Sequence, residues 1–542
     1  MELISIIVKE RDNMFTADNH EISYKELLAI KVKESPDHEM FNFAGKDYTW
    51  SDVDKLSTII AHDLSKMGVH KGSHVGICGR NSINWVLTFF AIQKLGAVAV
   101  LINFNLKSSE LVDIVHIGDI THLCFGDASP NIDPTHYDKY IAKVREDSTN
   151  AINCAYSFSD TIDFSTRLAE LPYLPTYEDV EVKYNDPAVM IFTSGSTGSP
   201  KGALHNSYTL IHSAYISFCK NHFTSEDREC FVLPLFHIFG LVQGFTGCML
   251  SDSKIYILAA PKTVPILDTI SNYKCTIFIS VPSVFLAMMN NPTFAVEKVL
   301  SVKYSLIGGA PITETQMTLL AEKFPNTAFA IGYGLSEMDP VSFTLFGDTL
   351  QHLCHTIGIP LDTIQVKIQN INTLEDCAPN EEGEILAKGP NQMLGYYNIP
   401  DVNQPIDRDG WLHTGDFGVM DEEGYISLTG RMKEIIIRGG ENITPLEIAT
   451  ALTALDGIAD AKVLPVPSYF WGEEVGAGIV LEDGATFDEE KVKAELKNVL
   501  ADFKIPSYFF VYDKFPMLSN GKVDAVTLRK EYAEKAKELA KK

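Results

Sequence analysis

The sequence predicts an α/β fold, in which a large N-terminal domain of two mainly parallel-sheet lobes precedes a smaller C-terminal domain. The main observation is an alternation of apolar, strand-like runs with longer helix-compatible runs. The strand-like runs are 75–78, 98–102, 276–280 and 304–307, and the helix-compatible runs are 85–95, 109–117 and 314–323. Such alternation is typical of parallel sheets that are covered by helices.

Two later changes of pattern complete the fold prediction. From 366 to 397, short strand-like runs are punctuated by Gly and Pro, which favours a small β-barrel-like subdomain. After Arg431, the strand-like IIIRGG is followed by helix, strand and helix patterns that suffice for an α+β domain. We therefore predict an N-terminal domain over 1–431 and a C-terminal domain over 432–542. The acidic, proline-containing segment 171–186 is expected to connect the two lobes.

Composition excludes several classes of partner. The 542 residues include 45 Lys and Arg against 71 Asp and Glu, which gives a formal net charge of −26 at pH 7. This charge argues against nucleic acid or an anionic membrane surface as a partner, so a bound polyanion needs local donors and a metal ion. Nine scattered cysteines form no C-x-x-C pair and no zinc-binding spacing, which favours a reduced, cytoplasmic location.

Neither a signal peptide nor a transmembrane segment is predicted. The opening MELISIIVKERDN has too short an apolar run, and an acidic residue where a signal peptide would be basic. The apolar stretch 85–102 is interrupted by Gln93 and Lys94, so we expect a helix followed by a buried strand. At the C-terminal end, Glu531 and Lys535 have the spacing of an ion pair on a solvated helix.

The stretch TSGSTGSPKG, residues 193–202, has the composition of a phosphate-binding loop. Glycines let backbone N–H groups approach oxygen atoms closely, hydroxyl groups add donors, and Lys201 adds a positive charge. The apolar run 189–192 before it and the helix-compatible run 203–220 after it predict a strand–loop–helix arrangement. The spacing fits neither a Walker loop nor a nucleophile elbow, and the alternative is a flexible surface turn.

Further motifs follow this loop along the chain. They are LPLFHIFG at 233–240, GYGLSE at 332–337, WLHTGD at 411–416, GRMKEIIIRGGENITP at 430–445 and SNGK at 519–522. Together with TSGSTGSPKG, and in this order, they resemble the adenylate-forming (ANL) superfamily of acyl- and aryl-CoA synthetases, luciferases and peptide-synthetase adenylation domains. The resemblance covers nearly the whole chain and implies that the substrates are ATP, a small carboxylic acid and coenzyme A, with Mg²⁺ required.

The resemblance also implies an ATP site. The residues that match its ATP and AMP contacts are Thr193, Ser194, Gly195, Ser196, Thr197, Gly198, Lys201, Gly308, Gly309, Ala310, Gly332, Tyr333, Gly334, Leu335, Ser336, Glu337, Asp416, Arg431 and Lys522.

Four of these residues are given a chemical role by the resemblance. Glu337 holds the magnesium ion, Asp416 binds the ribose hydroxyl groups, Arg431 contacts ribose and phosphate, and Lys522 is the catalytic lysine. A carboxylate can bind Mg²⁺ or two hydroxyl groups, and a cation opposes the repulsion between the two anions that react. The structural alternatives are a surface acid, a turn cap, an interdomain salt bridge and a solvated lysine, respectively.

The resemblance assigns further contacts to the acid and to coenzyme A. Phe236, His237, Gly308 and Gly334 line the acyl pocket, and His237 is counted with the catalytic residues. Gly334 replaces the bulky tryptophan of acetate-specific relatives, which indicates room for a longer or wider acid. Gly439, Gly440 and Glu441 match the coenzyme A contacts, and Lys433 matches the hinge about which the mobile C-terminal domain turns. For His237, the alternative is an ordinary buried core histidine.

The sequence therefore predicts an acyl-CoA synthetase of fatty acid metabolism, most simply for a medium- or long-chain acid, acting as a monomer or homodimer. Aryl or other bulky acids remain open, as does transfer to a carrier protein, although we expect no appended carrier domain. A luciferase-like oxygenase is a further alternative. A non-catalytic nucleotide-binding protein would be expected to lack one of Lys201, Glu337, Asp416, Arg431 or Lys522, and all are present.

Overall fold

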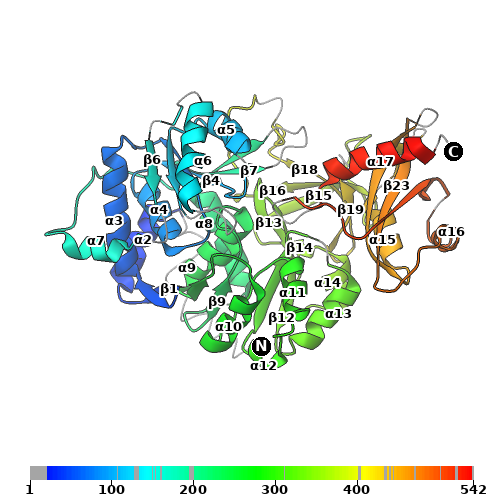
Figure 1. Cartoon of the computed structure of the whole chain (residues 1–542), viewed down its shortest axis with the longest axis horizontal. Coiled ribbons are helices and arrows are strands. Elements are labelled where there is room, and N and C mark those ends of the chain that lie inside the picture. The colour runs from blue at the N-terminus through cyan, green and yellow to red at the C-terminus, as the bar shows by residue number, and fades with distance from the viewer. Residues whose placement is uncertain are drawn as a thin grey trace. The chain divides into compact units, whose positions relative to one another are not determined.

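In the computed structural model, the chain forms two compact units (Figure 1). The first unit comprises residues 1–366 and 387–412, and the second comprises residues 367–386 and 413–542. The described residues are 21–106, 108–126, 134–148, 151–152, 154–158, 162–193, 200–221, 223–310, 312–400, 404–431, 436–438, 441–443, 445–468, 472–500, 502–518 and 523–539. Mixed α/β architecture with several sheets confirms the predicted fold class.

A seven-stranded sheet forms the first part of the first unit. Its order is β17 (Gly395–Tyr396), β8 (Lys201–Asn206), β7 (Pro187–Thr193), β4 (Val98–Ile102), β3 (His74–Cys78), β5 (His122–Phe125) and β6 (Cys154–Ser157). The strands from β7 to β6 are parallel, whereas β8 and β17 are antiparallel to their neighbours. Every residue of β4 is buried, as expected for a central strand of a parallel sheet that is covered on both faces.

Helices precede, join and follow these strands (Figure 1). They are α2 (Tyr24–Glu34), α3 (Trp50–Lys66), α4 (Ile83–Lys94), α5 (Ser108–Ile117), α6 (Pro134–Asp147), α7 (Phe164–Glu170) and α8 (Ser207–Asn221). Capping boxes start α2 and α3, where Ser23 pairs with Glu26 and Thr49 pairs with Asp52. The predicted helix and buried strand within 85–102 are confirmed as α4 and β4.

Two four-stranded sheets complete the strands of the first unit. One has the order β2 (Lys46–Thr49), β1 (Glu39–Phe43), β10 (Lys254–Ile257), β9 (Arg228–Phe231), and the other β11 (Tyr304–Gly308), β12 (Ala328–Leu335), β13 (Met338–Phe343), β14 (Ile359–Pro360). The expected strand at 276–280 forms only isolated bridges from Ile277 and Ser280, which join the two sheets.

The helices of this part follow the segment 233–240. They are a π-helix, η1 (Gly240–Thr246), then α9 (Gly247–Ser251), α10 (Thr263–Tyr273), α11 (Pro282–Met289), α12 (Val296–Val299), α13 (Glu314–Lys323) and α14 (Leu350–His355). Helix α13 has the bounds that the sequence predicts, and it starts with a capping box of Thr313 and Gln316. No helix among the described residues is long and apolar enough to cross a membrane.

Two predictions about local structure are wrong. The segment after the phosphate loop is strand β8, antiparallel to β7, and helix α8 begins only at Ser207, so a hairpin replaces the expected strand–loop–helix. Pairing with β7 outweighs the helical pattern of the local sequence. The connection 171–186 does not separate two lobes, because β6 before it and β7 after it belong to one sheet.

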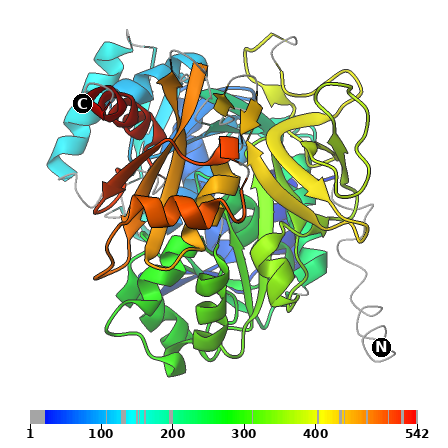
Figure 2. The same cartoon turned by 90° about the vertical axis from the view of Figure 1, so that its right-hand side faces the viewer.

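The second unit contains two further sheets (Figure 2). The first has the order β15 (Gln365–Gln369), β16 (Gly383–Lys388), β18 (Leu412–Met420), β19 (Ile426–Arg431). The second has the order β21 (Glu441–Ile443), β20 (Ile436–Arg438), β23 (Gly472–Leu481), β22 (Ile458–Ser468), with β24 (Tyr508–Tyr512) beside β23. Helices α15 (Pro445–Thr453) and α17 (Ala525–Leu539) contact β22, and α16 (Glu489–Leu496) and the 3₁₀ turn η4 (Asp502–Lys504) precede β24.

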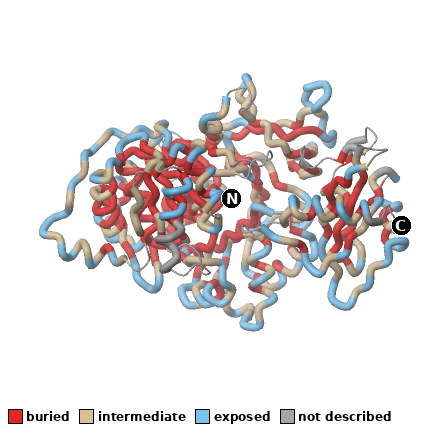
Figure 3. The backbone as a smooth tube through the Cα atoms, turned by 45° about the horizontal axis from the view of Figure 1, so that its top comes forward, coloured by how far each residue is buried: buried red, intermediate tan, exposed pale blue. Residues whose placement is uncertain are grey.

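The domain boundary that we expect after Arg431 falls between these two sheets, at the end of β19, and it remains a prediction. Each unit has an interior of buried residues, which Figure 3 shows in red. The eight described cysteine side chains are free thiols, and five of them are buried.

Candidate active site

The two ends of the phosphate loop are held side by side. Thr193, the last residue of β7, lies opposite Lys201, the first residue of β8. The hairpin is tight on one face, because a Cβ atom on Gly202 would lie 2.7 Å from the sulfur of Met190. Ser194, Gly195, Ser196, Thr197 and Gly198 lie outside the described residues, so their contacts with ATP stay a prediction.

Glu337 lies at the tip of the hairpin formed by β12 and β13. Leu335 at the end of β12 pairs with Met338 at the start of β13, so Ser336 and Glu337 occupy the turn between them. The side chain of Glu337 is half-buried, and its Oε1 atom accepts a hydrogen bond from the hydroxyl group of Tyr396. The carboxylate that the sequence assigns to the metal ion is therefore fixed in place by a residue of β17.

Two hydrogen bonds to backbone carbonyl oxygens hold the tip of this hairpin. The carbonyl oxygen of Ser336 lies 2.8 Å from Nε2 of His205 on β8, and the amide of Met393 donates to the carbonyl oxygen of Glu337 at 2.8 Å. Burial lowers the pKa of His205 to about 4, so the ring is neutral at pH 7. Because a carbonyl oxygen only accepts, Nε2 carries the proton of this neutral ring.

Tyr396 connects the two groups that the sequence predicts to meet the phosphates. Its strand, β17, pairs with β8, and the Nζ atom of Lys201 lies 5.0 Å from the centroid of the Tyr396 ring. Burial and the carboxylate of Glu337 raise the pKa of Tyr396, so its hydroxyl group stays protonated at neutral pH. Lys201, Tyr396 and Glu337 thus form one contiguous cluster, which we call the phosphate-site cluster.

The phosphate-site cluster fits a metal ion that arrives with a nucleotide. Among the described residues, no group of three or more His, Cys, Asp or Glu side chains could hold a metal ion. Magnesium is commonly held by one or two carboxylates together with the phosphates of the substrate, rather than by a cage of protein ligands. Glu337 could supply such a carboxylate, and Lys201 could supply a cation for the phosphates.

Glycines lie at the carboxyl ends of β11 and β12. Gly308 pairs with Gly332, and a Cβ atom on Gly308 would lie 3.1 Å from the Phe239 ring and 3.2 Å from the carbonyl oxygen of Gly332. Gly309 has a φ of +78°, and both it and Ala310 are exposed. The predicted nucleotide residues after β11 therefore lie at an accessible strand end, beside the β12 segment that leads to Glu337.

Hydrogen bonds from the side chain of Asn81 fix the backbone at the start of segment 233–239. The buried side chain of Asn81 donates to the carbonyl oxygen of Leu233 at 2.8 Å and accepts from the amide of Leu235 at 3.0 Å. His237 is exposed, so the alternative of a buried core histidine is wrong; its Nδ1 atom accepts from the amide of Phe239 at 3.3 Å. Phe236 is half-buried and meets Phe104 edge-to-face, with ring centroids 5.5 Å apart.

The space beside Gly334 is filled. A Cβ atom at this position would lie 2.2 Å from Oδ1 of Asp339, whereas the sequence predicts open space there. Asp339 is buried on β13, its Oδ2 atom lies 3.5 Å from the side-chain amide of Gln243, and burial raises the pKa of Asp339 to about 7. A buried carboxylic acid therefore adjoins the predicted acyl pocket, and no motif in the sequence indicates it.

In the second unit, the two predicted ribose contacts are brought together. Asp416 on β18 and Arg431 on β19 are directly opposite in the antiparallel register, and Asp416 is 2% exposed. The structure describes only the backbone of Arg431. Because these two strands pair, residues from the separate motifs WLHTGD and GRMKEIIIRGGENITP lie next to each other, as the predicted ribose contacts require.

The part of β18 before Asp416 is held by hydrogen bonds to residues that no sequence motif indicates. The buried carboxylate of Glu384 lies 2.8 Å from Nδ1 of His413 and accepts from the amide of Gly415 at 3.1 Å. The hydroxyl group of Thr414 donates to the carbonyl oxygen of Ile385 at 2.7 Å. Gly415 has a φ of +72°, a conformation that a residue with a side chain rarely adopts.

The remaining predicted residues cannot be placed. Lys433, Gly439, Gly440 and Lys522 lie outside the described residues. Glu441 is described only as the first residue of β21, where it pairs with Arg438 of β20. The predicted hinge, the coenzyme A contacts and the catalytic lysine therefore stay predictions.

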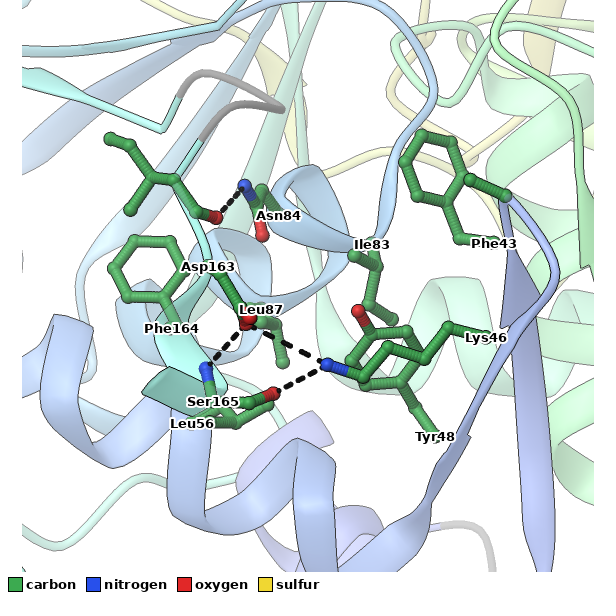
Figure 4. A pocket seen from close by; sticks show the side chains of 12 residues that line it. Phe43, Lys46, Tyr48, Leu56, Ile83, Asn84, Leu87, Asp163, Phe164 and Ser165 are labelled. Atoms are coloured by element: carbon green, nitrogen blue, oxygen red, sulfur yellow. Dashed lines mark hydrogen bonds and ion pairs between the residues drawn. The ribbon is translucent and has the colours of Figure 1, made fainter. Parts of the chain in front are cut away.

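A separate pocket of about 250 Å³ lies in the first unit between the β1–β2 hairpin and helices α3, α4 and α7 (Figure 4). The ammonium group of Lys46 lies 3.0 Å from Oγ of Ser165 and 3.6 Å from Asp163. None of the lining residues belongs to the motifs above. The pocket is therefore not part of the candidate active site.

Two family models match the chain. The AMP-binding enzyme family matches residues 28–397, and the AMP-binding enzyme C-terminal domain matches 447–522. The acyl-CoA ligase sidI of Aspergillus fumigatus is 32% identical, over 94% of this chain and 91% of its own. The mitochondrial medium-chain acyl-CoA ligase ACSF2 of Mus musculus is 29% identical, over 89% of this chain and 82% of its own.

Solved structures support the fold. The structure of ATP-bound MatB from Rhodopseudomonas palustris superposes with a TM-score of 0.84 and covers 94% of this chain and 99% of its own. At 23% sequence identity, this likeness shows the fold alone.

Proposed function

Because the chain belongs to the AMP-binding enzyme family, with acyl-CoA ligases among its relatives, we propose that it joins a carboxylic acid to coenzyme A at the expense of ATP. The observation that carries the proposal is the phosphate-site cluster, in which Tyr396 contacts both Glu337 and Lys201. The carboxylate of Glu337 and the ammonium group of Lys201 thus both lie against Tyr396, beside the end of the phosphate loop, which supports binding of a magnesium–nucleotide complex there.

The proposed reaction has two steps. In the first, an oxygen atom of the carboxylate forms a bond to the α-phosphorus of ATP, and pyrophosphate leaves. In the second, the sulfur of coenzyme A forms a bond to the acyl carbon, its proton passes to solvent, and AMP leaves. Neither step needs a covalent bond to the enzyme, so catalysis rests on alignment and charge stabilisation, of which alignment alone is worth about 7–11 kcal/mol.

The residues have distinct roles in this proposal. Magnesium would be held by Glu337, where its charge neutralises phosphate oxygens as pyrophosphate forms. Lys201 binds phosphate oxygens, and Asp416 and Arg431 hold the ribose. Lys522 places a cation between the carboxylate and the α-phosphate, where two anions approach each other. Gly439, Gly440 and Glu441 are proposed to contact coenzyme A.

For the acid, we propose a medium- or long-chain fatty acid as the first candidate. The name of the mouse relative and the apolar side chains of Phe236 and Phe239 support it. The buried Asp339 and Gln243 beside Gly334 favour the second candidate, an aryl or other bulky acid that carries a hydrogen-bonding group. The first candidate would place an apolar chain beside Gly334, whereas the second would place a hydrogen-bonding group there.

The proposal is tested by exchange of labelled pyrophosphate into ATP, which reports the first step alone. Wild-type protein is assayed with a series of straight-chain acids from acetate upward and with aryl and hydroxylated acids, and then for thioester formation with coenzyme A. We expect exchange that depends on the acid and is weakest with acetate. Exchange without a thioester would favour a carrier-protein acceptor, and nucleotide binding without exchange would favour a non-catalytic role.

A further inference from the structure

We propose that Tyr396 is a positioning residue for the ATP-dependent step, whose hydroxyl group orients the carboxylate of Glu337 and whose ring holds the ammonium group of Lys201. This assignment rests on the proposed function, because it takes Glu337 and Lys201 as the groups that meet magnesium and phosphate. Neither the motifs nor the composition indicates a role for Tyr396.

The backbone of Tyr396 is fixed relative to Lys201. Tyr396 lies opposite Ala203 in the β17–β8 pairing, and the amide of Tyr397 donates to the carbonyl oxygen of Gly202 at 2.8 Å. The side chain of Gln404 accepts from the amide of Tyr396 at 2.7 Å and donates to its carbonyl oxygen at 2.8 Å. The ring therefore projects from a segment whose amide and carbonyl groups are both hydrogen-bonded, beside the strand that starts with Lys201.

The hydroxyl group of Tyr396 fixes one oxygen atom of Glu337. It donates to Oε1, and a carboxylate has a second oxygen with lone pairs of its own. A phenol group donates and a carboxylate oxygen accepts, so the contact is a donor–acceptor pair. The contact thus selects one orientation of the Glu337 carboxylate and leaves Oε2 for a metal ion.

The ring of Tyr396 acts on Lys201 in a different way. The ammonium group lies 5.0 Å from the ring centroid, within the range of a cation–π interaction. This interaction is weaker than a charge-assisted hydrogen bond, so phosphate oxygens can take over the ammonium group when a nucleotide binds. Tyr396 thereby keeps the ammonium group of Lys201 near the proposed phosphate site, and it competes only weakly with phosphate for that group.

Two substitutions separate the two contacts. Tyr396→Phe removes the hydrogen bond to Glu337 and keeps the ring, whereas Tyr396→Leu removes both. Affinity for ATP is measured by calorimetry, once with excess Mg²⁺ and once with EDTA. For Tyr396→Phe we expect the dissociation constant of MgATP to rise about tenfold, as for loss of a hydrogen bond to a charged group, with the EDTA value unchanged. For Tyr396→Leu we expect the EDTA value to rise as well, about threefold or more.

Tyr397→Phe is the matched control. Its hydroxyl group donates to Asp119 at 2.8 Å, so this variant loses a tyrosine hydrogen bond next in the chain but outside the phosphate-site cluster. We expect its affinity for MgATP to match the wild type. The urea midpoint of each variant checks folding, and Tyr396→Met replaces the Leu variant if that variant does not fold.

The outcomes separate this assignment from the proposed function. Wild-type affinity for MgATP in Tyr396→Phe, or an equal loss with and without Mg²⁺, would overturn the role toward Glu337. An unchanged EDTA value in the folded Leu or Met variant would overturn the role toward Lys201. If the binding results hold but the wild type shows no acid-dependent pyrophosphate exchange, the proposed reaction fails while the positioning role stands. A wild type that binds no ATP would overturn both.

Discussion

Asp416 and Arg431 lie directly opposite each other on the antiparallel strands β18 and β19. Glu384 helps to set the position of Asp416, because its carboxylate accepts from the amide of Gly415, the preceding residue of β18. Residues that lie opposite each other in paired antiparallel strands have closely spaced Cα atoms, so the backbone brings these two positions together. This geometry supports the proposed ribose contact.

Replacing Asp416 by Asn should weaken ATP binding through the ribose. The amide keeps the size of the side chain but loses the charge, so we expect the KM for ATP to rise about tenfold or more. The wild type should prefer ATP to 2′-deoxy-ATP, and Asp416→Asn should lose most of that preference. Steady-state kinetics with the two nucleotides measure the ratio. Glu422→Gln, an exposed acid in the β18–β19 connection, is the control, and an unchanged preference in Asp416→Asn would contradict the assignment.

Removing the side chain of Lys522 should separate the two steps. We expect Lys522→Ala to slow pyrophosphate exchange by about 10²–10³-fold, the effect of losing one group that stabilises transition-state charge. Thioester formation from a supplied acyl-adenylate should stay near the wild-type rate, because no second anion approaches in that step. Lys514→Ala, at an exposed lysine nearby in the sequence, serves as the control. Equal loss in both assays would assign Lys522 a structural role.

The contact between Gly334 and Asp339 predicts a steric coupling. An added methyl group at Gly334 would lie 2.2 Å from Oδ1 of Asp339, so Gly334→Ala should lower the free energy of unfolding by about 1–3 kcal/mol. In an Asp339→Ala background the same change should cost clearly less, because the obstructing carboxylate is absent. Urea unfolding of the four proteins of this cycle gives the coupling energy. If Gly334→Ala costs the same in both backgrounds, the two residues are not coupled.

Elements with continuous apolar or well-capped local patterns could be predicted from the sequence. The run 98–102 forms a strand buried along its whole length, and helix α13, which starts with a capping box of Thr313 and Gln316, has its predicted bounds. The hairpin of β7 and β8 could not be predicted, because the local sequence of 203–206 fits a helix and only pairing with β7 makes it a strand. Similarly, 276–280 has a strand-like composition but forms isolated bridges.

The same division applies to the candidate site. Lys201, Glu337 and Asp416 stand in short motifs, and the resemblance of these motifs to the adenylate-forming superfamily, rather than the residue types alone, predicts phosphate, metal and ribose contacts for them. Tyr396 and Asp339 carry no such signal. Tyr396 reaches Glu337 only because β17 pairs with β8, and Asp339 meets Gly334 and Gln243 only across a hairpin and a π-helix. Such contacts depend on the tertiary fold and leave no local pattern.

The fully buried Glu229 predicts a pH dependence of stability. Its Oε2 atom accepts a hydrogen bond from the thiol of Cys248 at 2.8 Å, and its Oε1 atom has no hydrogen-bond partner among the described residues. Burial raises the pKa of Glu229 from 4.5 to about 8, and burial also raises the pKa of Cys248, so both groups are protonated at pH 7 in the folded protein.

The sign of the effect follows from proton binding. Between pH 4.5 and 8 the folded protein keeps the proton on Glu229, whereas the unfolded chain releases it, so the free energy of unfolding falls as pH rises, by about 1.4 kcal/mol per pH unit. Glu229→Gln should remove this contribution. Urea unfolding at pH 5, 6, 7 and 8 measures it as the difference in slope between wild type and variant, since Asp339 and other raised groups contribute equally to both. Glu226→Gln, at an exposed acid just before β9, should keep the wild-type slope. A Glu229→Gln variant with that same slope would show that Glu229 is ionised in the folded protein.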